Sequence, residues 1–245
     1  LSKIINSWQT ESYLPHLSPT LTALKIVREN LAPHQALIGF SGAPWTLATY
    51  MLNIRKAHGF EMVLATLTEQ RAALTQLLAL LADVVAVYLI EQLKAGANVV
   101  KIFDSWAGVV PLSLRSELIL APLQQIVAKV RQHFPEAPII YFGREISDFY
   151  PEIIKNISNL AFAFDQFVDP IKIRDNFQIL TPVQGNLDPE ILVLGGEKLV
   201  QATEKLLETL AKGPYVFNLG HGILPQTPLT HVQQVVDMVT QAEGF

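Results

Sequence analysis

Near the end of the chain, His221 stands between two glycines in the stretch NLGHG. It follows an apolar run that predicts a strand, so its imidazole is expected at a strand end, where it could contact a ligand. Glycines on both sides let another body approach the main chain closely. On spacing alone, ligand contact and a solvated loop position both stay open. The other five histidines are expected to be solvated: His16, His34, His58, His133 and His231.

The stretch GFSGAPWTLATYM is expected to end a strand at Ser41 and to begin a helix at Pro44. Gly42 allows the tight turn between them, and Pro44 has the backbone angle of a first helical turn. Tyr50 then lies about two turns into this helix, whose first backbone amides could face an anion. Packing of Trp45 and Tyr50 beneath neighbouring helices is the structural alternative.

Polar residues also follow two further predicted strands. In KIFDSWAG, Asp104 could act as a base or cap the next segment, and Ser105 could donate a hydrogen bond to a carboxylate. A turn whose Asp and Ser side chains satisfy local amides explains the same pair. The lack of a Gly-x-Ser-x-Gly pattern argues against Ser105 as a nucleophile. In PVQGNLDP, Gln184 and Asn186 follow a strand, and Asp188 is expected to cap a helix.

Six short apolar segments predict β-strands, and the stretches between them have helical patterns. The predicted strands are 36–42, 98–105, 138–143, 160–167, 177–186 and 214–220. The predicted helices are 59–96, 114–134, 147–158, 196–213 and 228–242. This alternation indicates βα units around a parallel sheet that is buried on both faces.

Chemically active side chains gather where the predicted strands end, whereas the joins that lead into strands are plain. In a (βα)8 barrel the active site lies at the carboxyl ends of the strands. We therefore expect an α/β fold, a (βα)8 TIM barrel of which this chain contains six βα units; an open doubly wound sheet is the alternative. The chain, residues 1–245, is expected to be a single barrel domain, with a loop and helix over 1–35 and the six units over 36–245.

The composition is that of a globular protein, with 50% hydrophobic and 16% charged residues. A formal net charge of −4 argues against a nucleic-acid surface but is compatible with an anionic small molecule held by local arginines. The chain has no cysteine, which excludes disulfides and sulfur-bound metals, and no metal site is expected. The most apolar stretch, 73–93, is interrupted by Gln76, Asp83 and Glu91, so we expect a buried helix and no membrane span.

Four segments together resemble the uroporphyrinogen decarboxylase family: GFSGAPWTLATYM, AGANVVKIFDSWAG, QGNLDPEIL and NLGHGILPQTP. The resemblance implies a (βα)8 barrel that works as a cytoplasmic homodimer in haem biosynthesis. It implies removal of four acetate carboxyl groups from uroporphyrinogen III, giving coproporphyrinogen III, with no metal or organic cofactor. The family's active-site tyrosine falls on Tyr50, its serine on Ser105 and its histidine on His221. Tyr50 and His221 are the catalytic candidates, and all three are candidates for substrate binding.

The family also has an arginine-rich segment of the type Met-Arg-Gln-Ala-Gly-Arg-Tyr and an aspartate that binds pyrrole N–H groups, and neither is found in this sequence. We therefore expect a fragment that lacks the first part of the barrel and is inactive alone. Two smaller departures are Arg144, where a lysine is expected, and Asp165–Gln166 in place of an Asp-Trp pair. The alternatives are a cobamide-dependent methyltransferase of the same superfamily, which would bind zinc through cysteine and histidine, and a non-catalytic tetrapyrrole-binding barrel.

Overall fold

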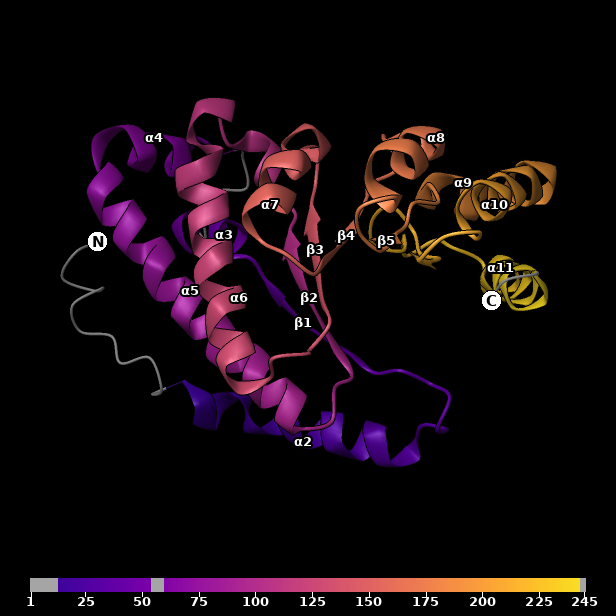
Figure 1. Cartoon of the computed structure of the whole chain (residues 1–245), viewed down its shortest axis with the longest axis horizontal. Coiled ribbons are helices and arrows are strands. Elements are labelled where there is room, and N and C mark those ends of the chain that lie inside the picture. The colour runs from indigo at the N-terminus through magenta and orange to yellow at the C-terminus, as the bar shows by residue number, and fades with distance from the viewer. Residues whose placement is uncertain (1–12, 54–59, 243–245) are drawn as a thin grey trace. The chain divides into compact units, whose positions relative to one another are not determined.

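The structure is a computed structural model that describes residues 13–53 and 60–242. It consists of two compact units, Leu1–Ser158 and Asn159–Phe245, and each of them alternates parallel strands with helices (Figure 1). The loop predicted before the first helix, up to residue 12, and His58 lie outside the described residues.

The first unit is built on three parallel strands, which lie in sequence order. They are β1 (Ile38–Gly42), β2 (Val99–Asp104) and β3 (Ile139–Gly143), within two residues of the predicted bounds. The described α-helices are α2 (Leu14–Asn30), α3 (Pro44–Asn53), α4 (Glu61–Glu69), α5 (Arg71–Lys94), α6 (Ala121–His133) and α7 (Tyr150–Asn156). Short helical turns join them: η1 (Ala107–Val109), η2 (Leu112–Leu114), the π-helical η3 (Ser116–Leu120) and η4 (Ser147–Phe149).

The register of these strands decides which side chains share a face of the sheet. Phe40 lies beside Lys101, and Phe103 lies beside Phe142. The Phe103 ring packs edge to face with the rings of Phe40 and Phe142, at centroid distances of 5.8 Å and 5.9 Å. The Lys101 ammonium lies 4.5 Å from the centre of the Phe103 ring. Burial lowers the pKa of Lys101 to about 8, because this environment solvates the charge less well than water does.

Helix α5 completes the hydrogen bonding of the first strand. The Gln92 side chain accepts a hydrogen bond from the Phe40 N–H (2.8 Å) and donates one to the Phe40 carbonyl (2.9 Å). Gly39 makes room for it, since a Cβ at that position would lie 2.7 Å from Gln92 Oε1. Gln92 thereby satisfies main-chain groups of β1 that would otherwise need another partner.

The predicted helix over 59–96 is wrong in its extent. Gln70 leaves the helical region of backbone space (φ −136°, ψ 40°) and separates α4 from α5. By length and composition alone, α5 is the one helix of the described residues that could cross a membrane, with a mean hydropathy of 2.1 over its most apolar window. Half of that window is buried inside the protein, and α5 packs against α6, α3 and β1, as a core helix does.

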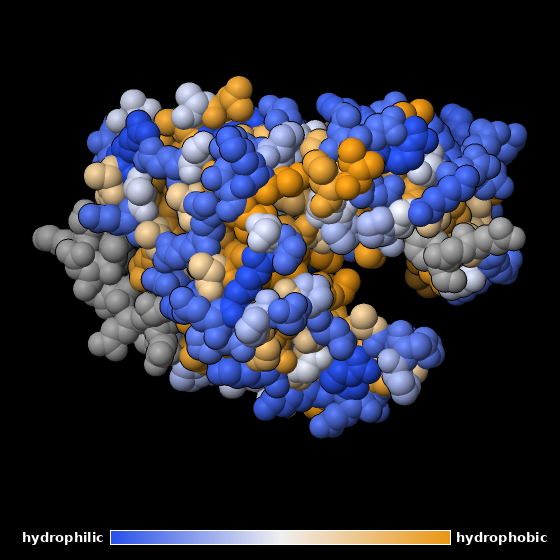
Figure 2. Space-filling view, in the orientation of Figure 1, coloured by the Kyte–Doolittle hydropathy of each residue, from blue (hydrophilic) through white to orange (hydrophobic). Residues whose placement is uncertain are grey.

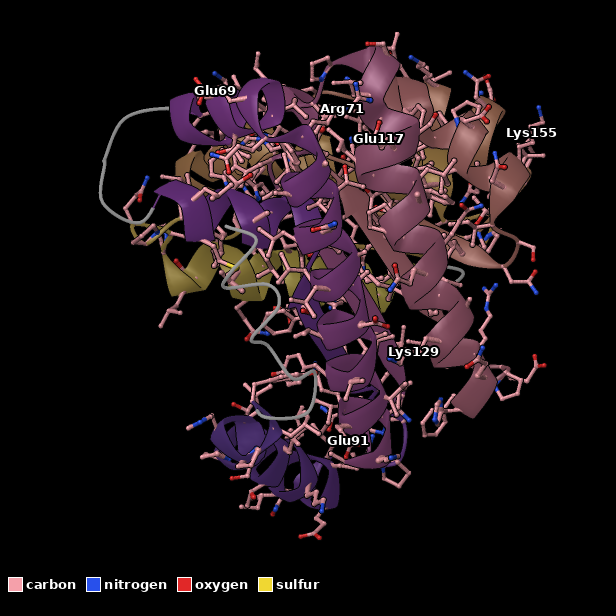
Figure 3. All side chains as sticks on the ribbon, turned by 90° about the vertical axis from the view of Figure 1, so that its left-hand side faces the viewer. Glu69, Arg71, Glu91, Glu117, Lys129 and Lys155 are labelled. Carbon is pink, nitrogen blue, oxygen red and sulfur yellow. The ribbon has the colours of Figure 1, made fainter. Side chains whose placement is uncertain are left out.

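Hydrophilic side chains cover much of the outward surface of α5 and α6 (Figure 2), and the two helices lie side by side (Figure 3). Arg71 on α5 and Glu117 on η3, the turn directly before α6, point toward each other and form an ion pair. Further along, Lys129 Nζ lies 2.9 Å from Asp83 Oδ1. Exposed pairs of this kind contribute little to stability, so the buried apolar side chains hold the two helices together.

The second unit also holds three parallel strands in its described residues: β4 (Leu160–Ala163), β5 (Val183–Gln184) and β6 (Tyr215–Val216). A bridge between Leu187 and Leu219 extends the pairing of β5 with β6. The helices are α8 (Pro170–Ile173), the π-helical η5 (Arg174–Gln178), α9 (Pro189–Leu194), α10 (Gly196–Leu210) and α11 (Leu229–Gln241).

The strands predicted over 160–167, 177–186 and 214–220 are too long. Residues 177–182 form the end of η5 and a turn, because the Phe177 ring packs 5.0 Å from the Phe164 ring and Gln178 Nε2 donates to the Leu210 carbonyl (2.7 Å). These tertiary contacts outweigh the β-propensity of the segment. Strand β4 ends early because Asp165 Oδ1 accepts a hydrogen bond from the Phe167 N–H (3.0 Å) and turns the chain.

The predicted cap at Asp188 is confirmed. Its Oδ1 accepts a hydrogen bond from the Glu190 N–H (2.9 Å), and Pro189 opens α9. Asp169 caps α8 in the same way, through the Ile171 N–H (2.9 Å). In both places an Asp-Pro pair ends a loop and begins a helix, as cap and first-turn preferences require.

Candidate functional site

A pocket of about 260 Å³ lies in the first unit, at the carboxyl ends of β2 and β3. Its wall combines two aromatic rings, a hydroxyl, a guanidinium and a carboxylate. The residues that line it are Phe60, Ser105, Trp106, Gly108, Val109, Arg144 and Glu145. This combination suits a ligand that has a flat apolar part and an anionic group.

Trp106 brings two of the predicted site residues together. Ser105 precedes it in the chain and lines the pocket. Tyr50, on α3, sets its ring edge-on to the Trp106 indole, with the ring centroids 6.3 Å apart. Tyr50 is not part of the pocket wall, but it is 54% exposed. A ligand that extends from the pocket past Trp106 can therefore reach it.

Helix α3 also holds the loop that carries Ser105 and Trp106. Trp45 is completely buried, and its Nε1 donates a hydrogen bond to the Trp106 carbonyl (2.9 Å). Thr46 Oγ1 accepts one from the Trp106 N–H (3.3 Å) and donates one to Asp104 Oδ1 (2.7 Å). The packing alternative of the sequence analysis is thus confirmed for Trp45 and wrong for Tyr50.

Asp104, predicted as a base or a cap, has a different place. It is only 1% exposed, and its carboxylate accepts hydrogen bonds from the hydroxyls of Thr46 (2.7 Å) and Tyr141 (3.3 Å). Burial raises the pKa of Asp104 to about 6, and the hydroxyl donors oppose this rise only in part. Asp104 does not line the pocket; it ties β2 to α3 and β3 directly before Ser105.

We expect Asp104 to make the stability of the protein depend on pH. Its pKa is about 6 in the folded protein, against 3.8 for an ordinary aspartate, so the folded state holds this proton more tightly. The resulting stabilisation is complete below about pH 4 and is lost as the pH rises through about 6. The shift of about two pKa units corresponds to about 3 kcal/mol of unfolding free energy. Urea unfolding from about pH 4 to about pH 8 measures it.

The variant Asp104→Asn tests this assignment, because it removes the titrating group and keeps the shape of the side chain. Its unfolding free energy should rise relative to that of the wild type by about 3 kcal/mol between about pH 4 and about pH 8. A difference between variant and wild type that stays constant over this range would mean that Asp104 does not titrate there.

Sequence reasoning noted Arg144 only as a departure from a family and assigned nothing to Glu145. Both line the pocket, and Arg144 Nε lies 3.3 Å from Glu145 Oε1. The Arg144 N–H donates to the Asp104 carbonyl (3.1 Å), which fixes the start of this loop against the end of β2. The available signal was their position directly after a strand, where polar residues of this fold class gather.

His221 belongs to the second unit, where it is exposed in the loop after β6. The two glycines beside His221 have different surroundings. A Cβ at Gly220 would lie 2.3 Å from the Gln166 main-chain nitrogen, whereas a Cβ at Gly222 would meet none of the described residues within 4 Å. The group that lies close to Gly220 is therefore the main chain of another segment of the protein. Only Gly222 leaves open space beside His221.

Gln184, the last residue of β5, and Asn186, which follows the strand, are both buried. Asn186 Nδ2 donates hydrogen bonds to the carbonyls of Asp165 (2.7 Å) and Val168 (2.8 Å). It therefore fastens the loop after β4 and has a structural role. Of the three predicted site residues, the structure places Tyr50 and Ser105 beside Trp106 in the first unit. The convergence of His221 with them on one ligand stays a prediction.

Comparison with known proteins gives consistent matches. A family model described as uroporphyrinogen decarboxylase (URO-D) matches residues 3–242. Proteins named uroporphyrinogen decarboxylase from Brucella anthropi and Brucella canis are each 41% identical over 234 residues, which cover 94% of this chain and 67% of theirs.

Two solved structures have the same fold at low sequence identity. A methyltransferase from Methanosarcina mazei aligns with this chain at a TM-score of 0.79 and 18% identity. The alignment covers 95% of this chain and 67% of the methyltransferase chain. A B12-independent methionine synthase from Shewanella sp. W3-18-1 has a TM-score of 0.60 at 14% identity, with coverage of 90% and 66%. At these identities the two structures bear on the fold alone.

Proposed function

The chain belongs to the uroporphyrinogen decarboxylase family, and we propose that the gene product containing it removes the four acetate carboxyl groups of uroporphyrinogen III, giving coproporphyrinogen III in haem biosynthesis. The observation that carries the proposal is the identity of 41% over 234 residues to enzymes of this name. The family match confirms the resemblance drawn from the four motifs and, with the parallel βα units, the predicted α/β barrel class.

Each decarboxylation needs an acceptor for the electron pair of the broken bond. Protonation of the ring carbon between the pyrrole nitrogen and the carbon that bears the acetate group turns the ring into a cation, whose positive charge reaches the acetate-bearing carbon and makes it an electron acceptor. The bond between the methylene and carboxylate carbons then breaks, its electron pair enters the ring system, and carbon dioxide leaves. A proton added to the methylene carbon and the loss of the ring proton restore the pyrrole. Each acetate thus becomes a methyl group with net uptake of one proton, and the substrate itself serves as the electron acceptor.

Three side chains bind the substrate in this proposal. Ser105 and Tyr50 donate hydrogen bonds to substrate carboxylates, and His221 binds a further carboxylate or a ring edge. The position of Ser105 in the pocket wall and of Tyr50 beside Trp106 supports the first two roles. The rings of Phe60 and Trp106, whose centroids are 4.9 Å apart and whose planes are inclined by 63°, offer apolar ring faces for a pyrrole. Tyr50 and His221 are the proposed catalytic residues, since donors held in place before the reaction stabilise charge that develops during it.

The proposal is tested by expressing the gene that encodes this chain in a strain that lacks uroporphyrinogen decarboxylase. We expect haem synthesis to be restored and the purified gene product to convert uroporphyrinogen III to coproporphyrinogen III. A folded gene product that neither restores growth nor forms coproporphyrinogen would overturn the proposal.

Removal of either donor in the first unit should weaken catalysis. We expect Ser105→Ala and Tyr50→Phe each to lower kcat/KM by about 10- to 100-fold, because each loses a hydrogen bond to a charged group. Ser18→Ala and Tyr88→Phe are the matched controls. They remove a serine hydroxyl from α2 and a tyrosine hydroxyl from α5, both outside the pocket wall. Equal activity of the site variants and their controls would remove Ser105 and Tyr50 from the proposed site.

The relatives favour the decarboxylase over the methyltransferase alternative. The identity of 41% links the chain to proteins named as decarboxylases, whereas the methyltransferase structure shares 18% and informs the fold alone. We further propose, from the family resemblance, that the protein is a cytoplasmic homodimer. Sedimentation equilibrium of the purified gene product and cell fractionation test these two points.

A further inference from the structure

Arg144 occupies a fixed position at the rim of the sheet in the first unit. It follows the last residue of β3, and its N–H is held by the Asp104 carbonyl at the end of β2 (3.1 Å). The main chain at this point is therefore part of the ordered strand ends, unlike that of a free loop. A side chain that starts from such a position is held in place before a ligand arrives.

The Arg144 side chain lines the pocket and is only 26% exposed. Among the described residues of the pocket wall it is the positively charged one, and it shares the wall with Ser105 and Trp106. Its Nε is buried and makes no hydrogen bond among the described residues, although Glu145 Oε1 lies 3.3 Å away. The ion pair with Glu145 thus leaves a buried donor without the alignment that a hydrogen bond requires.

The loop is shaped so that these two adjacent charges occupy the same wall. Glu145 has a left-handed backbone (φ 60°), an uncommon conformation for a residue with a side chain. Gly108, in the loop after β2, lets it fit, because a Cβ there would lie 2.9 Å from the Glu145 Cβ and 3.2 Å from the Arg144 carbonyl oxygen. Glu145 remains 55% exposed, so its carboxylate can turn toward solvent when another anion approaches Arg144. Strained backbone of this kind is often found at binding sites.

We propose that Arg144 binds a peripheral carboxylate of the tetrapyrrole, with the adjoining pyrrole against Trp106 and Phe60, and that this carboxylate replaces Glu145 as the partner of the guanidinium. The inference rests on the proposed function and adds to it the residue that neutralises one charge of the substrate. A guanidinium can hold a carboxylate through two parallel hydrogen bonds, and Ser105 in the same wall supplies a further donor. The carboxylate belongs either to an acetate or to a propionate group, and the two sources are separable by experiment.

The test measures binding of two stable porphyrins, uroporphyrin with acetate and propionate groups and coproporphyrin with propionate groups alone, by quenching of tryptophan fluorescence. Arg144→Gln should raise the Kd for uroporphyrin by about tenfold or more, because it removes a charge-assisted hydrogen-bonding partner. Arg144→Lys should recover part of this loss, since it keeps the charge but not the fork of two donors. An Arg144→Gln effect on uroporphyrin alone identifies an acetate carboxylate, and an equal effect on both porphyrins identifies a propionate.

Arg131→Gln is the matched control for net charge. Arg131 lies in the last turn of α6 and donates a hydrogen bond to the Ser158 carbonyl, away from the pocket wall. Its variant should bind both porphyrins like the wild type, and urea unfolding checks that all variants are folded. Arg144→Gln with wild-type affinity, in a protein that still forms coproporphyrinogen, overturns the assignment of Arg144 and leaves the proposed function standing. A wild-type protein that neither binds uroporphyrin nor decarboxylates uroporphyrinogen overturns the proposed function itself.

Discussion

Replacement of Trp45 by alanine is expected to lower the free energy of unfolding by about 3–5 kcal/mol, the range measured for large buried aromatic side chains. Trp45 is completely buried on α3, so its removal leaves a cavity that surrounding side chains fill only in part. It also removes the hydrogen bond from Nε1 to the Trp106 carbonyl (2.9 Å), which holds the loop beside the pocket. Urea unfolding followed by circular dichroism measures the loss of stability.

Trp45→Phe separates the two contributions, because phenylalanine fills most of the volume but cannot donate the hydrogen bond. We expect it to cost roughly half as much as Trp45→Ala or less. In both variants substrate binding should weaken, since Trp106 and Ser105 lose the support of α3. An alanine variant within about 1 kcal/mol of the wild type would mean that α3 does not anchor this loop.

Sequence reasoning located the first three strands well because β1, β2 and β3 are short apolar runs that end in polar turns. It placed the helix cap at Asp188 for a similar reason: an Asp-Pro pair acts through a hydrogen bond to the residue two positions away, as Asp188 does with Glu190. Such signals depend only on neighbours in the chain. They therefore predict the local structure without knowledge of the tertiary contacts.

The errors arise where distant residues decide the local structure. Residues 177–182 have the composition of a strand, but the contacts of Phe177 with Phe164 and of Gln178 with Leu210 hold a helical turn there. The reason for Gly220 was equally hidden, because the segment that approaches it is Gln166, far away in the sequence. The order of residues in one sequence does not show which distant segments lie close together in the folded protein.

The residues of the candidate site fall into the same two groups: those that a local sequence pattern predicts and those that only the packing of distant segments reveals. Ser105 and Tyr50 lie in distinctive motifs, and both were expected near a ligand. Arg144 received no role although it stands directly after a strand, and Phe60 enters the pocket wall from a segment that no local pattern connects with Ser105. Asp104 was noticed for its charge, yet its buried position between Thr46 and Tyr141 emerges only from packing. Sequence patterns thus found the motifs of the site but not the residues that complete its wall.

The glycines beside His221 provide the second large expected effect. Gly220→Ala would place a Cβ 2.3 Å from the Gln166 nitrogen and 2.8 Å from its Cα, and main-chain atoms cannot turn aside as a flexible side chain can. The loop must shift, so we expect a loss of at least about 2 kcal/mol in unfolding free energy. If His221 binds substrate, its displacement should also lower kcat/KM.

Gly222→Ala is the matched control on the other side of the same histidine. In the part of the chain that the structure describes, a Cβ at that position meets no atom within 4 Å, so the variant should unfold within about 0.5 kcal/mol of the wild type. Activity then gives a second comparison: open space beside His221 is needed only if a ligand occupies it. A Gly222→Ala variant that is stable but binds porphyrin weakly would place the ligand against Gly222. Equal stability losses in the two variants would contradict the packing difference between the glycines.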